Sequence, residues 1–77
     1  MKSLEQIFID HGFHTEYQDA KEIIKDNEYL LRSNVKDKEN KVYRNVLRNL
    51  HEFYYGKRED GKIMIIEIIE EFMKGVD

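Results

Sequence analysis

The chain has 77 residues, of which 40% are hydrophobic and 38% are charged, and its formal net charge is −3. At this length we expect a single domain, residues 1–77, with a thin core, because chains of about 60 residues bury only about 60% of their unfolded surface. The absence of cysteine excludes disulfides, thiolate metal ligands and a cysteine nucleophile, and it favours a reducing cytoplasm.

The distribution of apolar residues argues against a signal peptide and against a membrane span. The first apolar stretch contains Glu5 and Asp10, which a secretory signal would lack. The longest dense apolar run, from Ile63 to Ile69, is interrupted by Glu67 and falls far short of the roughly 20 residues that a span needs. We therefore expect a soluble cytoplasmic protein with no membrane partner. Abundant Lys, Glu, Ile and Asn without Trp, Cys or Pro is typical of small bacterial or phage proteins.

A capping signal marks the first predicted helix. Ser3 is followed three residues later by Gln6, which is the pattern of a capping box. The helix should run from Leu4 to about His11, and Gly12 should end it.

The second predicted helix begins with the same signal, Thr15 followed by Gln18, and runs to about Leu31. The next nine residues, 32–40, contain little apolar content and several turn formers. We expect them to form the central connection between two halves of similar plan.

Two amphipathic patterns predict the third and fourth helices. In the third, apolar residues recur at steps of three and four: Tyr43, Val46, Leu47, Leu50, Phe53 and Tyr54. The fourth places a polar face opposite an apolar one, with Glu67, Glu70, Glu71 and Lys74 against Ile65, Ile68, Ile69 and Phe72. The charged turn 57–62 separates the two helices.

A β-hairpin is the alternative for this last region. Asp60-Gly61 is a type I′ turn signal, and residues rich in β-branched and aromatic side chains flank it. The regular polar spacing of residues 67–74 favours a helix, because a strand would alternate with a period of two.

The predicted fold is therefore all-α, a small bundle of four helices arranged as two helical hairpins, with the β-hairpin version as an α+β alternative. The predicted core consists of Ile7, Phe8, Ile24, Leu31, Val46, Leu47, Leu50, Phe53, Ile65, Ile69 and Phe72.

No catalytic motif is evident, so we expect a protein that is not an enzyme and needs no cofactor. His11 and His14, near Asp10 and Glu16, could clasp a divalent metal, but no third clear ligand stands at a suitable spacing, and we predict no metal site. Histidines at a helix end more commonly assist the last carbonyls.

Charge is distributed unevenly along the chain. Residues 32–58 hold eight basic and three acidic side chains, whereas the segments on either side each carry a charge of −4. Lys41, Arg44 and Arg48 share one face of the third helix, where they could bind DNA or an acidic partner. The acidic ends of the chain oppose a polyanion, so nucleic acid is the disfavoured ligand. Pairing of these cations with acidic helix faces or with solvent is the simplest alternative.

An excess of apolar residues points to a contact surface. The fourth helix is apolar around most of its circumference, and aromatic residues widen the stripe at the end of the third. Tyrosine and methionine are common at such patches. The predicted protein-binding residues are Phe53, Tyr54, Tyr55, Ile63, Ile66 and Met73.

We therefore predict a small non-enzymatic protein-binding module, an adaptor or inhibitor, whose partner is another protein or a second copy of itself. The alternatives are a DNA-binding regulator that uses the basic face of the third helix and a structural subunit of a larger assembly. Tyrosine rings that cap the end of the core would explain the aromatic residues equally well.

Overall fold

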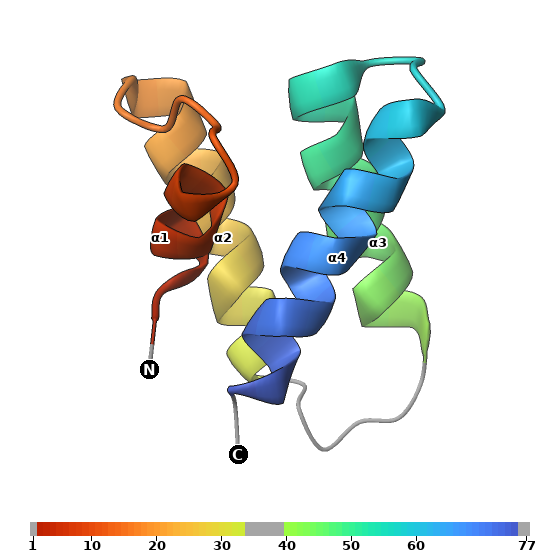
Figure 1. Cartoon of the computed structure of the whole chain (residues 1–77). Helices are drawn as coiled ribbons and strands as arrows, with labels where there is room; N and C mark the ends of the chain where they lie inside the picture. The colour runs from red at the N-terminus through yellow and green to blue at the C-terminus, as the bar shows by residue number, and fades with distance from the viewer. Residues whose placement is uncertain (1, 34–39, 76–77) are drawn as a thin grey trace.

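A computed structural model describes residues 2–33 and 40–75 of the chain. These residues form four α-helices and no strand: α1 (Leu4–Asp10), α2 (Gln18–Ser33), α3 (Asn40–Tyr55) and α4 (Asp60–Lys74). Each helix packs against the next, and α1 also packs against α4. In Figure 1, α1 and α2 form one pair and α3 and α4 run antiparallel as the other. The predicted all-α bundle is confirmed.

The first helix begins and ends as its sequence signals predict. The Ser3 side chain accepts a hydrogen bond from the Gln6 N–H at 3.1 Å, and the chain leaves the helix through Gly12, whose φ of +89° favours glycine. A second hydrogen bond at this N-terminus comes from α2, where the Glu28 carboxylate accepts from the Leu4 N–H at 2.6 Å. Glu28 therefore satisfies a free donor at the N-terminus of α1.

The second capping box is a wrong prediction. The helix begins at Gln18, three residues after Thr15 and two residues later than a Thr15 cap would place its start. Thr15 is instead buried, and its hydroxyl donates to the Glu5 carboxylate at 3.4 Å. Thr15 thus joins the loop before α2 to α1.

The β-hairpin alternative is also wrong, because Asp60-Gly61 forms the first turn of α4 and the flanking residues are helical. The predicted connection 32–40 is shorter at both ends, since α2 includes residues 32–33 and α3 begins at Asn40. Residues 34–39, to which the rest of that prediction applies, lie outside the described residues.

The core forms where the apolar faces of all four helices meet. Nine of the eleven predicted core residues are buried, and the structure adds Leu4, Ala20 and Ile68. Leu47 and Phe53 are only half-buried, because they lie at the edges of the α3 stripe. One buried polar side chain, Asn27, is satisfied by the Ile23 carbonyl and by Asn49 of α3.

Replacement of Leu50 should reveal how much this thin core contributes to stability. Leu50 is 0% exposed, so Leu50→Ala should lower the free energy of unfolding by about 2–5 kcal/mol through lost burial and a cavity. The matched control is Tyr29→Ala on α2, where the side chain is 70% exposed, and it should change stability by less than about 0.5 kcal/mol. Urea unfolding of both variants measures the difference, and equal losses would contradict this view of the core.

Candidate functional site

An open groove of about 960 Å³ lies between α3 and α4. Apolar and aromatic side chains from both helices line it, and basic side chains stand among them. Its lining residues are Tyr43, Arg44, Leu47, Arg48, His51, Glu59, Lys62, Ile63 and Ile66. Tyr43 and Leu47 pack partly against the core, and their remaining surface is left open at the groove.

Ile63 is the most exposed aliphatic residue of the groove. Its side chain is 63% exposed, whereas Ile66 and Leu47 beside it are half-buried. Exposure of one isoleucine alone is ordinary for a protein surface. Here it adjoins further apolar surface in the same concave site, which is the arrangement found where another molecule binds.

The basic side chains at the groove have no counterion among the residues that the structure describes. Among the described residues, no carboxylate lies within ion-pair distance of Arg44, Arg48 or Lys62, and Arg48 only donates to the Asn45 amide oxygen at 3.3 Å. Lys41 is exposed on α3 but does not line the groove. Lys41, Arg44 and Arg48 are thus exposed, and none of them pairs with an acidic residue in the described part of the chain.

Acidic side chains lie on the adjoining part of α4. Glu67 and Glu70 are exposed, as the amphipathic pattern predicts. Burial, together with the negative charge of Glu70, raises the pKa of Tyr43. The outer face of this helix pair therefore carries Lys41, Arg44 and Arg48 on α3, and Glu67 and Glu70 together with Lys62 on α4.

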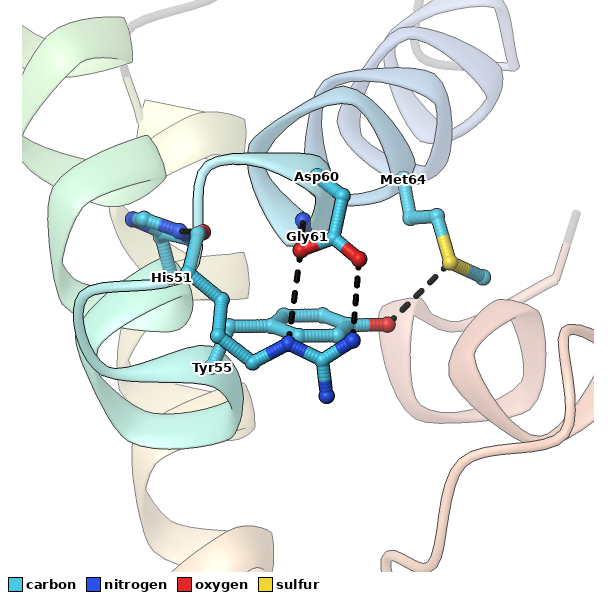
Figure 2. Close-up of polar contacts among 6 residues, drawn as sticks. His51, Tyr55, Asp60, Gly61 and Met64 are labelled. Carbon is cyan, nitrogen blue, oxygen red and sulfur yellow. Dashed lines mark hydrogen bonds and ion pairs between the residues drawn. The ribbon is translucent and has the colours of Figure 1, made fainter.

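The turn between α3 and α4 is closed by Tyr55. Its ring lies so close to the Gly61 backbone that a Cβ there would be 2.0 Å from the ring. Figure 2 shows this ring beside Gly61, with its hydroxyl donating to the Met64 sulfur at 3.2 Å. Arg58 lies over the ring and forms a bidentate pair with Asp60 at 2.9 and 3.3 Å.

His51 belongs to the same turn. It donates from Nε2 to the Arg58 carbonyl at 2.5 Å, and its ring stacks on Tyr55 with 6.2 Å between centroids. This side chain therefore helps to close the turn at one end of the groove.

The predicted aromatic contact residues lie elsewhere, in a cluster that joins α3 to the first half of the chain. Tyr54 stacks on Phe8 at 5.1 Å between ring centroids and donates to the His14 carbonyl at 3.2 Å. Phe53 stacks on Tyr17 at 6.0 Å, and Tyr55 meets the edge of Phe13. Phe53, Tyr54 and Tyr55 are all half-buried in these contacts.

The predicted binding residues are thus divided between three places. Ile63 and Ile66 line the groove, the three aromatic residues join the cluster, and Met73 is half-buried against the core. Sequence reasoning missed Lys62 and Glu59, because the periodicity assigned both to a turn. Lys62 could have been found from its place next to Ile63 in the sequence, because α4 begins earlier than expected and includes both residues.

The two histidines considered as metal ligands point to different partners. His11 lies 3.7 Å from Glu71 of α4, and His14 lies 3.3 Å from Glu16. The described part of the chain contains no group of three or more His, Asp or Glu side chains placed to hold a metal. None of its helices has the length and apolar character to cross a membrane.

Comparison with protein-family models finds no match, and comparisons with curated proteins and with solved structures find no significant similarity.

Substitution of Gly61 tests the Tyr55 contact. Gly61→Ala should displace the Tyr55 ring and destabilise the protein by about 1–3 kcal/mol, as overpacking generally does. In the double variant with Tyr55→Ala, the same substitution should cost less, because the obstructing ring is gone. Chemical unfolding of the four proteins in this cycle gives the coupling, and a coupling near zero would contradict the contact.

Tyr54 provides a test at alkaline pH. Burial raises the pKa of its phenol far above the ordinary value of about 10, so the neutral form is favoured in the folded state. Its contribution to stability is complete below about pH 10 and is lost as the pH rises further, because the unfolded phenol ionises first. Unfolding of Tyr54→Phe should therefore show a smaller loss of stability between about pH 10 and 12 than the wild type. An unchanged pH dependence would refute this role.

Proposed function

We propose that this chain is a small non-enzymatic protein-binding module that acts through the α3–α4 groove. The observation that carries the proposal is the combination of a 63% exposed Ile63, an apolar groove floor and basic side chains with no counterion among the described residues. A protein surface that brings apolar and acidic side chains together would complement both features.

The groove residues support binding more than catalysis. Neither Ser3 nor Thr15 lines the groove, and Thr15 is buried beneath α1. His51, the one imidazole in the groove, is engaged with the Arg58 carbonyl. A hydrolytic or acid–base mechanism would require a reactive group paired with a base, and these contacts favour a structural role instead.

DNA binding is the second candidate, because Lys41, Arg44 and Arg48 present three exposed cations along α3. Two features weigh against it. The carboxylates of Glu67 and Glu70 lie on the adjoining helix and would repel phosphates. The exposed Ile63 gains little from a phosphate backbone but much from an apolar side chain.

Site-specific photocrosslinking tests the proposed surface in the native cell. A photoreactive residue at Ile63 should give a defined protein adduct, because Ile63 would lie inside the contact. The same residue at Tyr29, which is equally accessible but lies on α2, should give none. Denaturing electrophoresis and mass spectrometry identify the adduct. Equal labelling from both positions, or an adduct with nucleic acid alone, would contradict the proposal.

A further inference from the structure

Two stripes of opposite charge cross the outer face of the α3–α4 pair. The basic stripe consists of Arg48, Arg44 and Lys41, and the second stripe consists of Ile63, Glu67 and Glu70. All six side chains are exposed. The two stripes lie on either side of the groove, so the face carries positive charge on one half and negative charge on the other.

The two stripes also have the same spacing. Because α3 and α4 are antiparallel, residue numbers that increase along α4 run beside residue numbers that decrease along α3 (Figure 1). In that direction both stripes advance by four residues and then by three, which corresponds to about 6 Å and about 4.5 Å along a helix. When the basic stripe of one copy lies along the second stripe of another copy, residues at equal steps along the two helices therefore stand opposite each other.

A two-fold axis parallel to the helices brings unlike stripes together. An isologous contact uses the same face of both molecules, and this axis sets α3 of one copy against α4 of the other. The basic stripe of each copy then meets the second stripe of the other, which sets Arg44 opposite Glu67, Lys41 opposite Glu70, and the aliphatic part of Arg48 opposite Ile63. An axis perpendicular to the helices would set α3 against α3, where like charges repel.

We propose that the occupant of the α3–α4 groove is a second copy of this chain, docked face to face about that two-fold axis. This inference rests on the proposed function, since it names the partner of the same surface. The cations of Arg44 and Lys41, which have no counterion among the described residues, meet Glu67 and Glu70 of the second copy, and each copy covers the exposed Ile63 of the other.

Charge reversal of either stripe tests the dimer. Sedimentation velocity of the full wild-type chain should give the mass of a dimer that dissociates on dilution and at high salt. Lys41→Glu with Arg44→Glu makes the facing positions of both stripes acidic, and Glu67→Lys with Glu70→Lys makes them basic. Each variant alone should be monomeric, with a dissociation constant raised at least about tenfold. Circular dichroism confirms that each is folded, as exposed positions allow.

Mixing the two variants is the decisive step. The altered α3 of the first variant then meets the altered α4 of the second with reversed polarity, and the other contact keeps its wild-type charges, so a one-to-one heterodimer should form. The matched control is Glu22→Lys with Asp26→Lys on the exposed face of α2. Its net charge equals that of the variant with Glu67→Lys and Glu70→Lys. This control still forms its own dimer, but it restores only one of the two contacts with the acidic variant, so the acidic variant should remain largely monomeric in that mixture.

Several outcomes would overturn the inference. A wild-type chain that is monomeric at every concentration, or a mixture that does not associate, excludes the dimer. Association that appears only when a DNA duplex is added would assign the basic stripe to phosphates instead. If the purified chain is monomeric while Ile63 still crosslinks to a different protein in cells, the second copy is the wrong occupant and the proposed function remains.

Discussion

The close contact between Tyr55 and the backbone of Gly61 fixes how α3 and α4 meet. Only a residue without a Cβ permits the ring to lie there, and Arg58 and His51 hold the ring from other sides. The angle and separation of the two helices depend on this turn. The groove beside it, with its apolar floor and basic edge, is a consequence of the same packing.

Much of the fold could be predicted from the sequence because the apolar periodicity is regular and proline is absent. The third helix was the clearest case, and Leu50 and Val46 are fully buried at its centre. Local signals were less reliable. Thr15 has the residue type of a cap, yet its hydroxyl donates to Glu5 across a turn, and Asp60-Gly61 opens a helix although it also fits a hairpin.

The candidate site was harder to predict, because residues on one helical stripe can face different neighbours. Tyr54 and Ile63 were assigned to one surface, but Tyr54 stacks on Phe8 of α1 while Ile63 remains in the groove. Sequence spacing places a side chain on a face of its own helix and does not say which helix covers that face. That Arg44 has no counterion in the described part of the chain likewise depends on the tertiary structure, which periodicity does not reveal.

The bond from Leu4 to Glu28 has a consequence for the order in which the chain folds and opens. A helix of seven residues is too short to persist in water, where isolated helices need about 12–15 residues. The first helix thus becomes stable only when it packs against the second and fourth helices, which must already be folded. In the native ensemble it should be the first unit to detach, as a local unfolding event that leaves the turn at Tyr55 intact.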